Sequence, residues 1–309
     1  MKKCTNRRNI AALIISYNCD YNIVNSVKNI IDEVDKVYIV DNGSSSESLS
    51  ILSELDNIKK INIIYNNENL GIAKALNIGI KEAKSENIEW ILTLDQDSLC
   101  EKNMIDNIFK YYQSLSYEEQ KKVGILAPIH RKIIDIKNIK NEAVDKKMLA
   151  GKEILAEITS GNIVKMEVFE VCGYFEEKLF IDYVDFEYCL RIKQFGYKII
   201  LVENAILFHI LGEPKELCIG KKKYIYSTHS EVRHYYMWRN RIYVWKKYIK
   251  HNYSWVIKDF ILCIRDFLKI IILEDNSIRK IKFSIYGIKD DLCNKYGKYE
   301  KKKGKKGEK

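Results

Sequence analysis

Two aspartates separated by a single residue, Asp95 and Asp97, end the apolar segment EWILTLDQDS. Alternate residues of a strand point to the same face, so we expect the two carboxylates to project together. Carboxylates held this close repel each other unless a cation lies between them. Mg²⁺ and Mn²⁺ prefer oxygen ligands and often share them with substrate phosphates. The same residues are equally consistent with an exposed strand end whose acidic side chains cap a helix.

A second polar pair, Asp41 and Asn42, ends the apolar segment KVYIVD. Gly43 permits a sharp turn, and the serines at 44–46 can cap a following helix. An acid beside an amide can hydrogen-bond a uracil or thymine ring and a ribose, but a capped strand–turn–helix connection explains these residues equally well. The chain contains no GxGxxG, which disfavours a dinucleotide site of the dehydrogenase type.

Three further acids, Asp182, Asp185 and Glu187, begin a helical stretch that contains Arg191. Carboxylates in this position usually stabilise the helix dipole, although one of them could serve as a general base. His209 follows the apolar run NAILF. A single histidine at a strand end is more often structural than a ligand.

The elements that would position these residues alternate between short apolar runs and helical spacing. Continuous apolar strands interleaved with helices favour an α/β fold whose parallel sheet is covered on both faces. In such a sheet the carboxyl ends of the strands form the ligand crevice. We therefore expect one rim to carry the polar residues that follow the strands: Asn18, Asp41, Asn42, Asn69, Asp95 and Asp97.

The middle of the chain is less regular. Residues 129–157 are polar and poorly periodic, and they predict no regular element. Residues 157–177 indicate a strand, a turn and a short helix, and residues 182–197 indicate a helix. The run KIILVENAILFHILGEP predicts a pair of strands that reaches His209.

The composition is that of a soluble globular protein. The chain has 309 residues, of which 47% are hydrophobic and 30% charged, so disorder, collagen-like repeats and a coiled-coil rod are excluded. With 2 Pro and 14 Gly, it has no room for a long flexible linker. Its 8 Cys form no CxxC pair, which is typical of a reduced protein of the cytoplasm.

The net charge of +10 comes from two local stretches, residues 221–250 and the Lys-rich end of the chain at 298–309. Such stretches suit an anionic membrane, a phosphate-bearing substrate or nucleic acid, or they are simply solvated. From Glu231 the chain becomes helical, aromatic and basic. Between Trp255 and Leu273 apolar residues recur every three or four positions with charges opposite, which predicts an amphipathic helix.

No segment predicts export or a membrane span. The apolar run from Ile10 to Ile15 is shorter than the core of a signal peptide. The segment from Trp255 to Leu273 contains five charged residues, so we do not expect it to cross a bilayer. We therefore expect a cytoplasmic protein. Such a protein could also contact the inner face of the cell membrane as a peripheral protein.

Eight motifs occur in order along the chain: IISYN, IVDNGS, NLGIAKALNIG, LTLDQDS, TSGNIV, GYFEEKLFIDYVDFEYCLR, FGYKI and LFHILG. Together they resemble the family 2 glycosyltransferases and, among these, the rhamnosyltransferase-like members. The resemblance covers about residues 10–212, with a weaker match at YYMWRNRIYVWKKY. It implies the Rossmann-like GT-A fold, a mostly parallel central sheet flanked by helices, here with a helical C-terminal extension.

The resemblance also implies a division of the chain. Residues 1–220 would form the catalytic domain, with a nucleotide-binding half at about 1–100 and an acceptor half at about 101–220. Residues 221–297 would form a helical, basic and aromatic region. Residues 298–309 would be a disordered tail.

The implied reaction is an inverting transfer from a nucleotide-diphosphate sugar. Asp185 aligns with the catalytic base of the family, although this chain has Val184 where the commoner pattern has Glu. Asp97 and His209, together with Asp95, would hold a divalent cation, Mg²⁺ or Mn²⁺. The residues implied to bind the donor are Tyr17, Asn18, Asp41, Asn42, Asn69, Gly71, Asp95 and Gln96.

The motifs LDQDS and HILGEP imply dTDP-L-rhamnose as the donor, and the acceptor would be a cell-surface polysaccharide or lipid-linked glycan precursor. The C-terminal helices could contact an anionic membrane, the catalytic domain or a second copy of the chain. Two alternatives remain at this point. A nucleotidyltransferase would release pyrophosphate, and a nucleic-acid-binding protein would leave the acidic rim unexplained.

Overall fold

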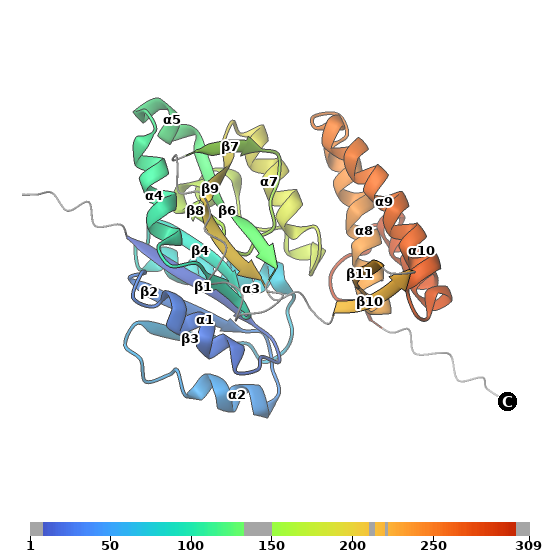
Figure 1. The fold of residues 1–309 in the computed structure, drawn as a ribbon, viewed down its shortest axis with the longest axis horizontal. Coiled ribbons are helices and arrows are strands. Elements are labelled where there is room, and N and C mark those ends of the chain that lie inside the picture. Colours follow the sequence, from blue (N-terminus) through green and yellow to red (C-terminus); the bar gives the residue numbers. More distant parts are fainter. Residues whose placement is uncertain (1–8, 133–149, 210–213, 220–221, 301–309) are drawn as a thin grey trace, which may run out of the picture.

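The computed structural model describes residues 9–132, 150–209, 214–219 and 222–300 (Figure 1). The first two ranges hold a layered α/β unit. Its elements, in chain order, are β1 (Ile10–Ser16), α1 (Asn22–Ile30), β2 (Lys36–Asp41), α2 (Ser46–Ser53), β3 (Ile61–Tyr65), α3 (Ile72–Ser85), β4 (Trp90–Asp95), β5 (Ser98–Cys100), α4 (Met104–Ser114), α5 (Tyr117–Lys122), β6 (Val123–Lys132), β7 (Gly151–Ile154), β8 (Ile163–Lys165), α6 (Met166–Cys172), the 3-10 turn η2 (Glu177–Leu179), α7 (Val184–Gln194) and β9 (Lys198–His209).

Within the described residues nine strands form one mixed sheet in the order β3-β2-β1-β4-β8-β6-β9-β5, with β7 paired to β9. β3, β2, β1 and β4 are parallel, and β6 is parallel to β9, whereas β8 is antiparallel to both of its neighbours. The predicted α/β architecture, a central sheet flanked by helices with a helical C-terminal region, is confirmed.

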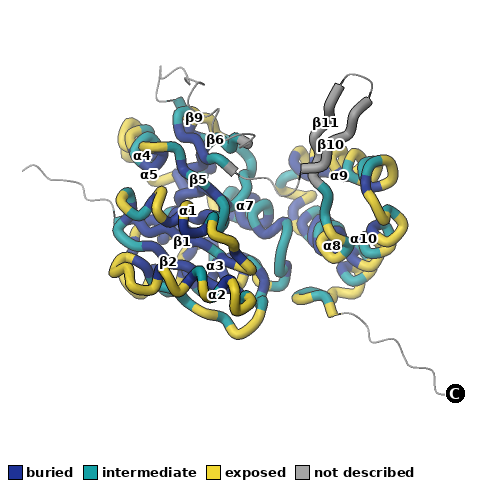
Figure 2. Tube along the Cα trace, turned by 60° about the horizontal axis from the view of Figure 1, so that its bottom comes forward, coloured by how far each residue is buried: buried dark blue, intermediate teal, exposed yellow. Residues whose placement is uncertain are grey.

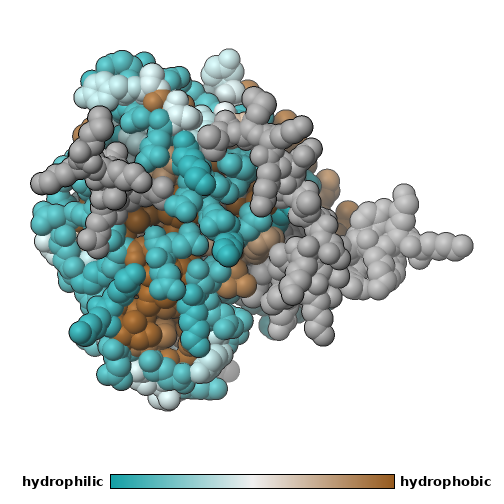
Figure 3. Space-filling model, turned by 60° about the vertical axis from the view of Figure 1, so that its left-hand side comes forward, coloured by the Kyte–Doolittle hydropathy of each residue, from teal (hydrophilic) through white to brown (hydrophobic). Residues whose placement is uncertain are grey.

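Hydrophobic cores lie on both faces of the sheet because successive strand residues point to opposite sides. In β1, Ile10, Ala12 and Ile14 join one core, and Ala11 and Leu13 join the other. β1, β2 and β4, at the centre of the unit, are almost fully buried, and β1 and β2 are dark blue in Figure 2. The face turned forward in Figure 3 is largely hydrophilic, with apolar side chains gathered in one band.

Two parts of the middle segment differ from the prediction. Residues 198–209 form the single strand β9 instead of a strand pair, and its pairing with β6 is interrupted between Val202 and Ile206. An irregular register lets one long strand bend, so the polar residues within the run do not mark a turn. The segment 129–157 includes the end of β6 and all of β7, and its residues 133–149 lie outside the described ranges.

The C-terminal region is a helical unit beside the sheet (Figure 1). It consists of the hairpin β10 (Pro214–Ile219) and β11 (Lys222–Ser227), followed by α8 (Glu231–Tyr248), α9 (Tyr253–Leu273) and α10 (Ser277–Leu292). The hairpin spans the predicted boundary at residue 220. Lys298 and Tyr299, which the sequence analysis assigns to a disordered tail, instead contact Glu68 and the hydroxyl of Tyr236.

The predicted amphipathic helix is confirmed as α9, but much of its apolar stripe faces outward. α8 packs on the α/β unit through Val244 and Tyr248, which share a core with Tyr183 and Leu190, and the start of α9 joins the same core through Trp255. In the described ranges, no helix is both long and apolar enough to cross a membrane.

Candidate active site

The carboxyl ends of three parallel strands meet at one edge of the sheet. Ser16 at the end of β1 is the register partner of Asp41 at the end of β2, and Ile15 is the partner of Asp95 at the end of β4. Loops that follow parallel strands open on the same side of a sheet. The expected acidic and polar rim is therefore confirmed at this edge.

Asp97 does not lie on a strand. β4 ends at Asp95, and Gln96 and Asp97 form a turn before β5. The prediction that the two aspartates share a strand face is wrong, because side-chain alternation ends where the chain turns. Gln96 connects this turn to two other elements. Its side-chain oxygen accepts a hydrogen bond from the N–H of Tyr17, just after β1, at 2.9 Å. Its carbonyl accepts from the hydroxyl of Ser26 in α1 at 3.1 Å.

The last residue of β9 lies beside this turn. Antiparallel pairing makes Ser98, which directly follows Asp97, the register partner of His209. The backbone of His209 is thereby brought next to the two aspartates, although its role as a ligand stays a prediction. Among the side chains that the structure describes, no group of three or more His, Cys, Asp or Glu is arranged to hold a metal ion.

Ser160 is a positioning residue that the sequence analysis did not identify. Its hydroxyl accepts from the backbone N–H of Asp95 at 3.0 Å and lies 2.8 Å from the hydroxyl of Ser98. Its carbonyl is 2.8 Å from Nε2 of His130. The motif TSGNIV contains this serine directly before Gly161, whose φ of 86° favours glycine. A glycine required by the backbone is the sequence signal that could have pointed to this turn.

The carboxylate of Asp41 is buried and bound within its own turn. It accepts from the N–H groups of Gly43 and Ser44, both at 3.1 Å, and from the hydroxyl of Ser44. Nearby, the side-chain oxygen of Asn18 accepts from the N–H of Ser45 at 3.0 Å. These bonds close the turn between β2 and α2, although Ser45 at the N-cap of α2 makes no side-chain capping bond. A role for Asp41 toward a pyrimidine stays a prediction.

Asn42 and Asn69 join the loops after β2 and β3. The amide of Asn42 donates to the side-chain oxygen of Asn69 at 3.1 Å, and its own oxygen accepts from the N–H of Leu70 at 3.0 Å. The oxygen of Asn69 also accepts from the N–H of Gly71 at 2.9 Å. The predicted donor loop is therefore a preformed structure held by two amide side chains.

The donor loop packs on the segment that leads into α7. Phe180, Asp182 and Tyr183 have φ values of 67°, 63° and 63°, a left-handed backbone that costs free energy in residues other than glycine. The carbonyl of Phe180 accepts from the N–H of Ile72 at 2.7 Å. A Cβ atom on Gly71 would overlap the ring and carbonyl of Phe180, so this contact requires glycine.

Two of the three predicted acids near the start of α7 form ion pairs with cations. Glu187 is fully buried and forms ion pairs of 2.8 Å with both Arg191 and Lys247. Asp182 forms an ion pair of 3.2 Å with Arg233. These contacts give both side chains a structural role and leave Asp185 as the candidate base.

Asp185 is partly buried, and its carboxylate accepts from the N–H of Phe186 at 2.8 Å. Burial raises its pKa to about 7. The backbone N–H of Phe186 opposes this rise in pKa, and the neighbouring negative charges of Asp182 and Asp95 add to it. Asp185 lines the same small cavity as Thr93 of β4, two residues before Asp95, so the start of α7 lies close to this edge of the sheet. A carboxyl that titrates near neutral pH is suited to general-base catalysis.

Helix α8 holds the strained segment in front of Asp185. The buried amide of Asn240 donates to the carbonyls of Leu179, Ile181 and Asp182 at 2.8, 2.7 and 2.9 Å. The buried guanidinium of Arg239 donates to the carbonyl of Leu179 at 2.8 Å. These bonds satisfy carbonyl groups of an irregular segment that runs from the end of the 3-10 turn η2 to α7.

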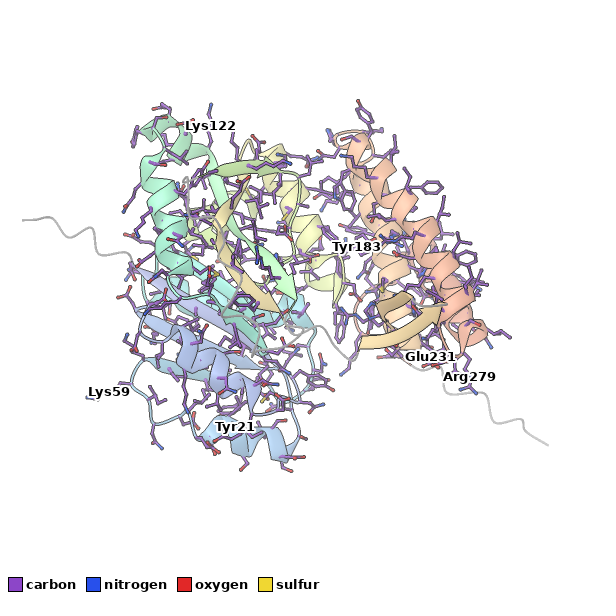
Figure 4. All side chains as sticks on the ribbon, in the orientation of Figure 1. Tyr21, Lys59, Lys122, Tyr183, Glu231 and Arg279 are labelled. Carbon is purple, nitrogen blue, oxygen red and sulfur yellow. The ribbon has the colours of Figure 1, made fainter. Side chains whose placement is uncertain are left out.

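A buried network extends this support to α9. Tyr183, which Figure 4 labels at the junction with the C-terminal helices, donates to the carboxylate of Asp259 at 3.0 Å and contacts the guanidinium of Arg241. Trp245 donates to the same carboxylate at 2.7 Å. Burial raises the pKa of Tyr183 well above its usual range.

Five of the nine Lys and Arg at 221–250 are buried or form ion pairs within the protein. Arg239 and Arg241 are buried. Arg233, Lys246 and Lys247 form ion pairs with Asp182, Asp291 and Glu187. Lys250 is exposed, and the side chains of residues 221–223 lie outside the described part of the chain.

Known proteins resemble the chain along most of its length. Residues 12–118 match the family model "Glycosyl transferase family 2". The dTDP-rhamnosyl transferase RfbF of Shigella flexneri is 31% identical over 248 residues, which are 77% of this chain and 80% of that protein. The chain belongs to the family 2 glycosyltransferases. This membership favours sugar transfer over the nucleotidyltransferase and nucleic-acid-binding alternatives.

Two solved structures show the same fold as this glycosyltransferase. The mannosyltransferase PcManGT from Pyrobaculum calidifontis, in complex with GDP-Man and Mn²⁺, aligns with a TM-score of 0.57 and 16% identity over 94% of this chain and 89% of that one. GalNAc-T7 with UDP, GalNAc and Mn²⁺ aligns with a TM-score of 0.61 and 15% identity over 93% of this chain and 56% of that one. They support the GT-A fold predicted from the sequence.

Proposed function

We propose that this glycosyltransferase transfers L-rhamnose from dTDP-L-rhamnose, with inversion, to a hydroxyl of a cell-surface polysaccharide or lipid-linked glycan precursor. The donor is supported by the likeness to a protein named dTDP-rhamnosyl transferase. The observation that carries the mechanism is the carboxylate of Asp185, which has no cation partner among the described residues and a pKa raised to about 7.

Asp185 acts as the general base. An acceptor hydroxyl is a weak nucleophile, so a carboxylate within about 3 Å must take its proton as the new bond forms. The hydroxyl oxygen bonds to the anomeric carbon on the face opposite the diphosphate, and the bond to the diphosphate breaks. One displacement inverts the anomeric configuration and needs no second catalytic carboxylate, unlike glycoside hydrolysis.

The donor occupies the rim between the loops after β1, β2, β3 and β4. Asp95 and Asp97, with His209, are the candidate ligands of Mg²⁺ or Mn²⁺. A cation that shares its coordination with a diphosphate needs only one or two protein carboxylates, so the described residues fit such a site without a third acid. The chemistry supplied there is neutralisation of the leaving diphosphate. The remaining donor contacts come from Tyr17, Asn18, Asp41, Asn42, Asn69, Gly71 and Gln96.

The domain division follows from these roles. The nucleotide-binding half comprises about residues 1–100, the acceptor half about residues 101–220, and the helices of 221–297 support the segment that carries the base. The bonds from Asn240 to that segment support this last role.

A screen of nucleotide sugars, with Mg²⁺, with Mn²⁺ and with a chelator, tests the proposal. We expect dTDP-L-rhamnose to raise the melting temperature and to release dTDP, and we expect both effects to need the cation. Release of pyrophosphate, or a response to a different nucleotide sugar alone, contradicts the proposed donor chemistry.

Asp97→Ala sharpens this test. We expect it to weaken cation-dependent donor binding on the order of tenfold or more, because a cation ligand is lost. Titration calorimetry with dTDP measures the effect. Asp32→Ala is the matched control, since Asp32 is exposed in a turn before β2, at the other end of the strands. Equal binding by both variants in Mn²⁺ contradicts the metal role of Asp97.

A further inference from the structure

α9 presents an apolar face that is largely uncovered in the described protein, although Phe260 contacts the ring of Trp245 in α8. Its residues recur every three or four positions along the helix, and each is between 49% and 71% exposed. This outer apolar face consists of Ile257, Phe260, Ile261, Ile264, Leu268, Ile271 and Ile272. The helix packs inward through a different face, which includes Val256, Cys263 and Ile270.

The outer apolar face is too large to be incidental. Single exposed apolar side chains are common on soluble proteins, but contiguous apolar patches mark surfaces that contact a partner or a lipid. Figure 2 shows the exposed segments of α9 and α10, on the side of the C-terminal unit that faces away from the sheet in Figure 1.

Basic residues line one side of this face. Lys258 and Arg265 are exposed and seven positions apart, so they lie on one strip of the helix next to the apolar residues. Arg265 also contacts Asp266 at 3.3 Å and is nevertheless 72% exposed. The acids of α9 are turned inward, where Asp259 and Asp266 bind Arg241.

The exposed side of α10 has the same chemistry. Ile278, Lys282, Ile285, Lys289 and Leu292 are exposed and recur every three or four positions, so apolar and basic residues alternate along it. Most of the cationic groups of α8 are paired within the protein, whereas Lys258, Arg265, Lys282 and Lys289 of α9 and α10 are exposed.

We propose that the outer apolar face of α9 docks on an anionic lipid bilayer, with the helix lying in the plane of the interface. An apolar strip flanked by Lys and Arg matches the two layers of such a surface, acyl chains below and phosphate groups above. The five charges of α9 prevent it from crossing the bilayer. Pairing of this face with a second copy would instead bring like charges together.

Flotation of the full chain with lipid vesicles tests the proposal. We expect binding to vesicles of phosphatidylcholine with phosphatidylglycerol, weaker binding at high salt, and little binding to phosphatidylcholine alone. The triple variant Ile261→Ser, Ile264→Ser and Leu268→Ser should reduce binding on the order of tenfold or more. Lys258→Glu with Arg265→Glu should reduce it on the order of tenfold.

The control variant replaces two apolar residues that are equally exposed outside the C-terminal helices, Val171→Ser with Phe195→Ser. It should bind vesicles as the wild type does, and all variants should keep the wild-type melting temperature because the replaced side chains are exposed. Wild-type binding by the triple variant overturns the proposal. So does light scattering that shows a dimer which the triple variant dissociates, if neither protein binds vesicles.

Discussion

Two consecutive helices, α8 and α9, reverse the usual relation between residue type and burial. α8 buries charged and amide side chains, including Arg239, Asn240 and Arg241, whereas α9 exposes isoleucines such as Ile261 and Ile272. In α8, Arg239 and Asn240 bond the segment before α7, and Arg241 bonds Asp259 of α9. In α9 the acids Asp259 and Asp266 point inward, whereas a row of large apolar residues points outward.

The difference shows that the two helices face different partners. A buried polar group is tolerated where its hydrogen bonds are satisfied. In α8 the strained backbone in front of Asp185 accepts the hydrogen bonds of Arg239 and Asn240, so this helix supports that segment. α9 supplies one buried carboxylate, Asp259, to the same network and leaves its largest apolar surface to the outside. The predictions below test this division, starting with the reaction that α8 supports.

The largest effect is expected at the carboxylate that α8 holds in position. Asp185→Asn should lower kcat about 10³-fold, because the amide cannot take the acceptor proton, while donor binding stays within about twofold. Product release measured at saturating donor, with calorimetry of dTDP binding, separates the two quantities. Turnover near that of the wild type would remove Asp185 from the mechanism.

A smaller loss is expected when the support itself is removed. Asn240→Ala removes the side-chain donor of the carbonyls of Ile181 and Asp182, whereas the carbonyl of Leu179 keeps Arg239 as a donor. We therefore expect kcat to fall by about 10-fold to 100-fold with a smaller change in KM for the donor. Val244→Ala is the matched control, since Val244 is buried on the same helix but packs on apolar side chains. If both variants lose the same activity at the same melting temperature, Asn240 has no positioning role.

The pH dependence of the reaction should report the surroundings of Asp185. With its pKa raised to about 7, kcat/KM should rise with pH through neutrality, because only the ionised carboxylate is a base. Asp182→Asn removes a neighbouring negative charge and should move this rise to lower pH. An unchanged pH profile in Asp182→Asn contradicts the electrostatic coupling.

The same raised pKa affects stability. The folded state favours the protonated form of Asp185, so this contribution to stability is present below the ordinary aspartate pKa of about 4 and is lost as pH rises through about 7. Melting temperatures of Asp185→Asn should lack this part of the pH dependence.

The smallest effect is expected on the outer apolar face. Ile272→Ala should change the free energy of unfolding by no more than about 0.5 kcal/mol, because the side chain is 71% exposed. Ile270→Ala, two residues away, removes a side chain that is 1% exposed and should cost about 2–5 kcal/mol. Denaturant titration of both variants measures the contrast, and equal losses would mean that the outer face is packed in solution.

Much of the fold and part of the site could be predicted from local patterns. The apolar runs that end at Asp41 and Asp95, the helix at α7 and the common rim depend on strand and helix periodicity, which neighbouring residues encode. The turn at Asp97 and the single strand β9 were missed, because polar residues in an apolar run are compatible with either a turn or a bend. The partners of Asn240 lie about sixty residues away in the chain, and no local pattern reports them.

The amino-acid sequence by itself determined the alternating α/β elements, the acidic rim and the amphipathic character of α9. Its motifs also indicated the family 2 glycosyltransferases. Only the tertiary structure decided which of three acids stays free of a cation, which arginines of α8 are buried, and that the apolar face of α9 points outward. The physical reason is that periodicity fixes which residues share a face, whereas burial and ion pairing depend on what packs against that face from distant parts of the chain.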